Sequence, residues 1–417
     1  MRETKKVMIN YLDLCSGAGG LSLGFHKTKK YNPIEFIEID KKCCETLKEN
    51  FPEHKKNINN KDINDIDFTN KKYKNLDLIT IGSPCQSFSY AGNKEGFADK
   101  RGNLLLKFIE ILAIIKPKMF LIENVRGLKS HDEGKSLKLL LRKLEKTGYN
   151  VKHALLNSVN YNVPQKRVRL FIFGIYTQSS LDASSPSVRV GCIRSRSDRI
   201  NRSVQTMGLE HEEFVSTRPQ PRDVNTYKFP KPNDNIITLE KILKKPFPTE
   251  FPNEVTSNYN DKKKKYFKKI PQGGCWTSLS VSDQKEYLGK SYFSGGGKRG
   301  ILRRLSYNEP SLTILCSPQQ KQTERCHPSE NRPLTIRESA RIQTFPDSYI
   351  FKGSICSQYK QIGNAVPVKL AKYLAKSIYK YYKKIKKEEE DKEKREDKDI
   401  NFISDIIYEI MKRKKKN

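Results

Sequence analysis

Strand-like apolar segments alternate with helical patterns through residues 1–177, and this alternation restricts the fold more than any other feature of the sequence. The apolar segments lie at 8–16, 34–40, 76–82, 118–125, 150–158 and 167–175. Helical patterns lie between most of them, at 19–28, 41–51, 102–117 and 136–148. Parallel strands require a crossover connection, usually a helix, so this order predicts a parallel sheet covered by helices on both faces. The predicted fold class is α/β.

Beyond residue 177 the pattern changes and divides the chain. Residues 178–227 contain no lysine, seven arginines and many serines, and we interpret them as a mobile loop or an insertion. Residues 228–332, with short strand-like runs such as SLTILCS, are predicted to complete a smaller irregular domain that spans 178–332. The α/β pattern returns over 333–382 and completes the first domain. The charged segment 383–417 is interpreted as a tail, either a solvated helix or disorder, with a short amphipathic helix near its end.

The composition indicates a polyanionic partner. The 80 Lys+Arg against 47 Asp+Glu give a formal charge of +33, and nucleic acid is the default partner of so basic a chain. A skewed genome composition would also raise the lysine content. No apolar run is long enough for a membrane helix and the N-terminus lacks a signal-peptide core, so a cytoplasmic protein is predicted. The nine cysteines include no CxxC pair, which predicts neither disulfides nor a metal site.

The glycine-rich turn DLCSGAGG (13–20) follows the first predicted strand and opens the first helix. Such glycines let a ligand approach backbone N–H groups at a helix N-terminus, although a plain turn would have the same composition. The next strand ends in EID, which places Glu38 where an acidic residue typically binds a ribose hydroxyl pair. The KDI segment adds Asp62 and Ile63 at the expected adenine position. Because nothing resembles a P-loop, the pattern favours an adenosine ligand without a triphosphate, and S-adenosylmethionine fits.

A cysteine follows the third of these strands on a rigid turn. In GSPCQSFS (82–89), Pro84 restricts the backbone before Cys85, whose neighbours are polar. The alternative is that Cys85 is a small buried hydrophobic residue, as most cytosolic cysteines are. The next strand delivers Glu123 to the same edge, and QKRVR (165–169) adds basic residues. A thiol, a carboxylate and guanidinium groups in one cleft indicate an active site.

These segments resemble the cytosine-5 DNA methyltransferase family. The matching stretches, in the family's order, are DLCSGAGG, EID, GSPCQSFS, RGNLL, ENV, QKRVR, RESARIQTFPDS and QIGNAVP, within 8–177 and 333–380. The resemblance implies a Rossmann-like, S-adenosylmethionine-dependent fold with a mixed, mostly parallel sheet. It makes 1–177 the catalytic and cofactor-binding domain and 178–332 the target-recognition domain. One departure is Cys15, where the family usually has a phenylalanine that packs against adenine, and we expect this change to weaken cofactor binding without abolishing it.

The resemblance also assigns catalytic roles. A thiolate at Cys85 would add to carbon 6 of cytosine and activate carbon 5 for methylation. Glu123 is expected at ring nitrogen 3, and Asn124 is expected to orient its loop. Arg169, with Arg167 beside it, is expected to contact the base carbonyl. This chemistry requires the base to be flipped out of the duplex. Two further residues lie on the loop expected to close over DNA: Gln86 and Ser89.

The predicted ligand-binding residues follow from the same matches. The cofactor set comprises Cys15, Ser16, Gly17, Gly19, Gly20, Glu38, Ile39, Asp62, Ile63, Pro84, Leu104, Asn364, Ala365 and Val366. The DNA-binding set comprises Ser89, Arg101, Gln165, Arg303 and Arg304. Arg303 and Arg304 follow a glycine-rich turn that could approach a groove; in the alternative interpretation they are surface arginines paired with acids such as Glu309.

Three alternatives are weighed against this interpretation. A tRNA cytosine methyltransferase of the same superfamily would have a much smaller recognition region. A catalytically silent DNA-binding regulator should have lost Cys85, Glu123 or Arg169, and all three are present. An amino-methylating enzyme would need a DPPY-like tetrapeptide, which is absent. The sequence therefore predicts a bacterial modification enzyme, monomeric, acting on double-stranded DNA, whose cognate restriction endonuclease, where one exists, acts separately.

Overall fold

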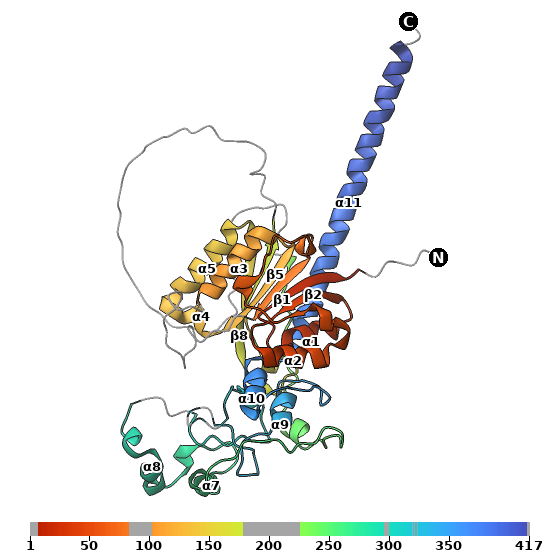
Figure 1. Cartoon of the computed structure of the whole chain (residues 1–417). Helices are drawn as coiled ribbons and strands as arrows, with labels where there is room; N and C mark the ends of the chain where they lie inside the picture. Colours follow the sequence, from red (N-terminus) through yellow and green to blue (C-terminus); the bar gives the residue numbers. More distant parts are fainter. Residues whose placement is uncertain are drawn as a thin grey trace, which may run out of the picture.

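The computed structural model describes residues 7–82, 102–177, 226–295, 300–318, 320, 322 and 324–414. Its centre is a seven-stranded sheet in the order β3-β2-β1-β4-β5-β8-β6 (Figure 1). The strands are β1 (Ile9–Leu14), β2 (Tyr31–Ile37), β3 (Ile58–Asn59), β4 (Leu78–Gly82), β5 (Met119–Val125), β6 (Tyr149–Asn157) and β8 (Val168–Tyr176). All pairs from β3 to β5 are parallel, whereas β8 is antiparallel to both β5 and β6. This confirms the predicted α/β class with a mixed, mostly parallel sheet.

Helices cover both faces of the sheet. Along β5, Met119 and Leu121 pack into one core with α1 (Gly20–His26) and the first part of α11 (Val368–Lys414). Phe120 and Ile122 pack into the opposite core with α3 (Gly102–Ile115) and α5 (Lys135–Lys146), next to α4 (Gly127–Ser130) (Figure 1). Because alternate side chains are buried on opposite faces, the strands need to be apolar throughout, and this explains the continuous hydrophobic runs.

A third core joins the C-terminal segment to the beginning of the chain. It contains residues of α2 (Lys41–Asn50), α9 (Ile336–Ile342) and α10 (Ile355–Asn364). The Tyr349 hydroxyl donates a 2.6 Å hydrogen bond to the carbonyl oxygen of Ala18 in the glycine-rich turn. Residues more than 300 positions apart in sequence therefore pack into one α/β unit.

The smaller region has a core of its own, formed among α7 (Asp261–Phe267), α8 (Val281–Leu288) and the loops up to Cys326. The short helix α6 (Glu240–Leu243) precedes it. Only Ser311–Leu312 (β9) of the predicted strand SLTILCS pairs, in parallel with Gln165–Lys166 (β7). Before α6, Tyr227 is fully buried in the core beneath the sheet, stacked on Phe173 of β8 at a 3.9 Å centroid distance. The domain boundaries themselves stay a prediction.

The C-terminal part is one continuous helix, α11, rather than a helix followed by a separate tail. It projects away from the domain toward the C-terminus (Figure 1). Residues 383–414 contain no glycine or proline that would end a helix, and they are rich in Lys and Glu, which are strong helix formers. The helical alternative for the charged segment is therefore confirmed as far as Lys414, but the helix expected near residue 400 is not a separate element. None of the described helices combines the length and the apolar character that crossing a membrane requires.

Candidate active site

The carboxyl ends of four neighbouring strands form the edge at which the predicted site residues gather. Leu14 at the end of β1 pairs with Ile37 of β2 and Ile81 of β4, and Gly82 pairs with Glu123 of β5. The antiparallel direction of β8 brings its first residues to this same edge, where Arg169 pairs with Val125. The edge therefore collects the glycine-rich turn, Glu38, Glu123 and Arg169, as the sequence predicted.

The glycine-rich turn is held open by positive φ angles. Cys15, Gly17 and Gly19 have φ of 51°, 54° and 73°, a region that costs a non-glycine residue strain. The Ser16 hydroxyl donates to the carbonyl oxygen of Asp13 at 2.8 Å. Burial raises the pKa of the Cys15 thiol. The turn thus presents its backbone at the start of α1 in a fixed shape.

Glu38 is fixed by the backbone of the turn. Its carboxylate accepts hydrogen bonds from the N–H groups of Gly17 (2.7 Å) and Asp40 (2.8 Å). Burial raises the pKa of Glu38, although these hydrogen bonds oppose the shift. A carboxylate has about four acceptor sites, so two such bonds leave capacity for ligand hydroxyl groups.

The space next to this carboxylate is suited to an adenosine. A Cβ atom added at Gly17 would meet nothing within 4 Å. Ile39 is 65% exposed, although large aliphatic side chains are usually buried, and it lies directly after Glu38. Asp62 caps the turn η2 (Ile63–Asp65) by accepting from the Asn64 N–H at 2.9 Å, and Ile63 is buried behind it. An open cradle, an acid and an exposed apolar surface fit the nucleoside part of S-adenosylmethionine.

The segment QIGNAVP lies against the glycine-rich turn. A Cβ atom at Gly20 would come within 2.5 Å of the Val366 carbonyl oxygen and 3.0 Å of the Ala365 Cβ, so only glycine permits this approach. Asn364 is exposed at the end of α10 and accepts a 2.9 Å hydrogen bond from the Cys316 thiol. Leu104 of α3 is half-buried against the core beneath the edge. The structure thus brings the described members of the predicted cofactor set together, with one exception. For Leu104 it shows only packing against the core.

Glu123 and Arg169 form the polar pair of the site. The Nε atom of Arg169 lies 3.2 Å from Oε1 of Glu123, and the Glu123 side chain is 8% exposed. Burial raises the pKa of Glu123, with Arg169 and Arg167 opposing the shift. The buried Asn124 side chain accepts from the Val125 N–H at 2.7 Å, which fixes the chain just beyond Glu123. A carboxyl group whose pKa is raised can retain a proton for donation.

The expected contact of Arg167 with the base was wrong. Its side chain is 1% exposed and donates to the carbonyl oxygens of Gly363 (2.9 Å) and Ile314 (3.3 Å). Burial, together with the nearby Arg169, lowers its pKa to about 9. Arg167 therefore joins β8 to α10 and to the loop after β9, and it acts as a positioning residue.

The predicted contact of Gln165 with DNA was also wrong, because its side chain is buried and hydrogen-bonded within the protein. It is fully buried, donates to the Gln343 side chain at 2.9 Å and accepts from the Ile314 N–H at 2.9 Å. These two bonds use its amide to join three segments of the chain. A buried, paired amide cannot reach a base edge.

The predicted contact of Arg304 with DNA was also wrong, because the side chain is buried. It is 5% exposed, and its guanidinium donates to backbone carbonyl oxygens of Phe267, Ile270, His327, Pro328 and Glu330. The alternative of surface arginines paired with Glu309 was also wrong, because Glu309 pairs with Lys166 at 2.7 Å. Arg303 is half-buried and donates to the Gly273 carbonyl oxygen at 3.1 Å, so its contact with DNA stays a prediction.

We expect Arg304→Ala to destabilise the smaller region instead of relaxing specificity. Removing the guanidinium leaves several buried carbonyl groups without a donor, at a cost of about 3 kcal/mol or more. Urea denaturation measures this loss, with Arg303→Ala as the matched control. A stable Arg304→Ala protein that methylates additional sequences would restore the original hypothesis.

Five predicted site residues lie outside the described part of the chain: Pro84, Cys85, Gln86, Ser89 and Arg101. The roles given to them stay predictions.

Two described residues of the site were not predicted from the sequence. Asp13 is buried beneath the glycine-rich turn, accepts hydrogen bonds from Ser22 and Thr80, and has a pKa raised to about 6 by burial. The sequence could have indicated Asp13, because it is an acidic residue inside an otherwise apolar strand. Cys316, which donates to Asn364, had no signal in the sequence.

This sheet, with its glycine-rich first turn and the acid that follows its second strand, defines an α/β protein of the Rossmann-like class. The sequence model of the C-5 cytosine-specific DNA methylase family matches residues 9–380. The protein belongs to this family and is a DNA cytosine-5 methyltransferase. The resemblance found in the sequence is confirmed.

Individual relatives agree with this assignment. The chain is 41% identical over 377 residues to the type II methyltransferase M.Sau96I of Staphylococcus aureus, covering 89% of this chain and 76% of that protein. It is 40% identical over 378 residues to the type II methyltransferase M.Eco47II of Escherichia coli, covering 90% of this chain and 79% of that protein.

Two solved structures share the fold. DNMT2 of Spodoptera frugiperda has a TM-score of 0.54 at 18% identity (coverage 89% and 99%). EhMeth of Entamoeba histolytica has a TM-score of 0.57 at 15% identity (coverage 90% and 99%).

Proposed function

We propose that this protein transfers a methyl group from S-adenosylmethionine to carbon 5 of cytosine in a specific double-stranded DNA sequence. The observation that carries the proposal is the Glu123–Arg169 pair, which lies next to Gly82, the last described residue before the Cys85 turn. The type II names of the relatives support a role as the modification enzyme of a restriction–modification system. We expect a cytoplasmic monomer, with any cognate endonuclease acting separately.

The proposed reaction begins on the flipped-out base. The Cys85 thiolate adds to carbon 6, and the electron pair of the 5,6 double bond moves toward the ring carbonyl and nitrogen 3. Glu123 holds a proton at nitrogen 3, and Arg169 both holds the Glu123 carboxyl group in place and faces the base carbonyl. Carbon 5 then acts as the nucleophile. Loss of its proton and elimination of the thiolate restore the ring and free the enzyme.

The cofactor would lie over the glycine-rich turn. Glu38 would accept hydrogen bonds from the ribose hydroxyl groups, and Ile39 would cover one face of the adenine with Asp62 at its edge. Gly17 leaves room for the ligand next to the backbone, whereas the space at Gly19 is filled by Leu47, Phe51 and Tyr349. Ala365 and Val366 would close the pocket from the side of α10. When bound, S-adenosylmethionine supplies an electrophilic methyl group to carbon 5.

Bisulfite sequencing of DNA from an expressing host tests the function directly. Conversion-resistant cytosines at one recurring sequence are expected. A host genome with no protected cytosine, although the folded protein is present, would contradict the proposal. Protection confined to tRNA would instead favour the tRNA methyltransferase alternative.

We expect Glu38→Ala to weaken S-adenosylmethionine binding by about 10- to 100-fold, because hydrogen bonds to a charged group contribute about 1.5–3 kcal/mol. Isothermal titration calorimetry measures the affinity. Glu45→Ala is the matched control, since Glu45 lies on α2 in a surface ion pair with Lys42. DNA affinity should be unchanged in both variants, and an unchanged cofactor affinity in Glu38→Ala would remove Glu38 from the site.

A further inference from the structure

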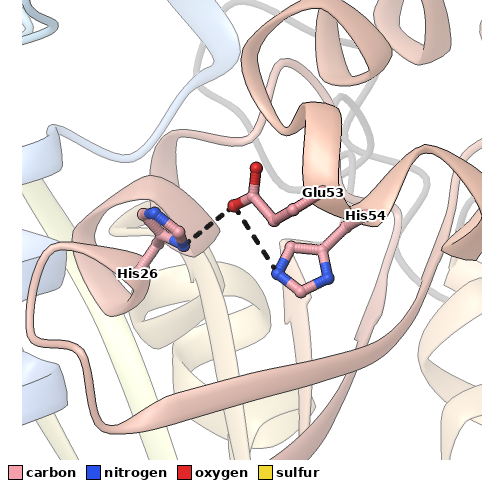
Figure 2. Close-up of side chains that lie close together, drawn as sticks. All are labelled: His26, Glu53 and His54. Carbon is pink, nitrogen blue, oxygen red and sulfur yellow. Dashed lines mark ion pairs between the residues drawn. The ribbon is translucent and has the colours of Figure 1, made fainter.

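Two histidines and a glutamate meet on the surface of the catalytic domain, away from the residues assigned above. His26 is the last residue of α1, and Glu53 and His54 lie in the 3₁₀ helix η1 (Pro52–Asn57) that follows α2. Figure 2 shows both imidazole rings directed at the same carboxylate oxygen. Nδ1 of His26 lies 3.6 Å, and Nε2 of His54 lies 3.7 Å, from Oε1 of Glu53.

The spacing of these three atoms is close to that of a metal-ligand set. All three candidate ligand atoms lie within 4.8 Å of one another. A tetrahedral ion with bonds of about 2.0–2.1 Å separates its ligand atoms by about 3.4 Å. The two contacts to the carboxylate are already within a few tenths of an ångström of that value. The third separation, between the two imidazole nitrogens, is at most 4.8 Å, so side-chain rotation has to shorten it by up to about 1.4 Å.

The two histidines are held by a common packing partner. The ring of Phe51, which is buried, packs edge-on against His26 with centroids 5.7 Å apart. The backbone N–H of His54 donates to the Phe51 carbonyl oxygen at 3.0 Å. Phe36 of β2 packs against Phe51 at 5.3 Å and against His54 at 6.4 Å. The ligand atoms are therefore presented by two elements that share one core.

The site is also accessible. The side chains of His26 and Glu53 are 46% and 47% exposed, and that of His54 is 18% exposed. An ion could enter from solvent, and water could complete its coordination. Two imidazoles with one carboxylate suit Zn²⁺ and neighbouring transition metals such as Co²⁺ and Ni²⁺, whereas Mg²⁺ and Ca²⁺ prefer oxygen ligands.

We propose that His26, Glu53 and His54 form a binding site for one divalent transition-metal ion of the zinc class. The bound ion joins the C-terminal end of α1 to η1. Because the opposite end of α1 begins at the glycine-rich turn, the ion lies outside the catalytic site and stabilises the fold that carries the cofactor turn. Its presence should raise the unfolding temperature without entering the methyl-transfer reaction. The sequence predicted no metal site, because His26 is separated by 26 residues from the adjacent pair Glu53 and His54 and the spacing matches no recognisable motif.

The test is a titration of the full-length, metal-free protein with Co²⁺, followed by its absorption spectrum. One equivalent is expected to bind without a thiolate-to-cobalt charge-transfer band, because the ligands are nitrogen and oxygen. Each of His26→Ala, His54→Ala and Glu53→Gln should weaken binding by at least about 10-fold, because loss of a group that only hydrogen-bonds to a ligand already costs about 10- to 100-fold. The same variants should lose the Zn²⁺-dependent rise in unfolding temperature, which follows mass action in the wild type.

His131→Ala is the matched control, since His131 contacts Ser136 at the start of α5, on the opposite side of the sheet. It should bind like the wild type. Absence of binding, binding that all three variants retain, or a charge-transfer band from cysteine ligands would each overturn the proposal. In those cases the three side chains form a surface ion-pair cluster only.

Discussion

Cys85→Ser is expected to reduce methyl transfer by about 10⁴-fold or more, the scale of loss when an attacking nucleophile is removed. A serine hydroxyl at neutral pH is far less nucleophilic than a thiolate, so addition to carbon 6 would become the limiting step. DNA affinity should change little, because the substitution alters one atom. Methyl transfer from labelled S-adenosylmethionine measures the activity, and gel-shift titration measures binding.

Trapping of a covalent enzyme–DNA adduct tests directly whether Cys85 is the nucleophile. DNA containing 5-fluorocytosine should form a stable covalent adduct with the wild type, because fluorine at carbon 5 prevents the proton loss that precedes elimination. Cys356→Ser, at an exposed cysteine in α10, is the matched control and should form the adduct normally. If Cys85→Ser formed the adduct, or the active wild type did not, the covalent mechanism would be refuted.

Glu123→Gln is expected to lower kcat by about 10²–10⁴-fold, the usual contribution of general acid–base catalysis. Glutamine keeps the shape and a hydrogen-bonding group but cannot transfer a proton to ring nitrogen 3. Glu110→Gln, at an exposed α3 residue that pairs with Lys107, is the matched control and should retain full activity. Single-turnover kinetics separate this chemical step from product release.

The expected pH dependence of kcat/KM follows from the direction in which the pKa of Glu123 is shifted. Burial raises the pKa of Glu123, so its proton persists at higher pH than in an exposed glutamate. Because the protonated form is the donor, kcat/KM should fall as pH rises through the folded-state pKa of Glu123. Glu123→Gln should lack this decrease. If the wild type and the variant had the same pH profile, the proton donor would be another group.

The sequence predicted the sheet and its functional edge because both depend on local patterns. Continuous apolar runs such as Met119–Val125 are required where a strand is buried on both faces, and helices between them enforce parallel pairing. The carboxyl ends of such parallel strands necessarily share an edge, so the strand pattern alone places Glu38 and Glu123 there. The order of the family's motifs added the chemistry.

Burial of polar side chains was decided by the tertiary structure alone. Arg304 follows a glycine-rich turn that made it look exposed, yet segments 23–37 residues away supply the carbonyl groups that enclose it. Gln165 meets Gln343 across 178 positions, and Arg167 meets Gly363 across 196. In the same way, His26 approaches Glu53 only because Phe51 and Phe36 pack α1 beside η1. Strand and helix patterns reflect neighbours in sequence, whereas these contacts depend on which distant segments the folded chain brings together.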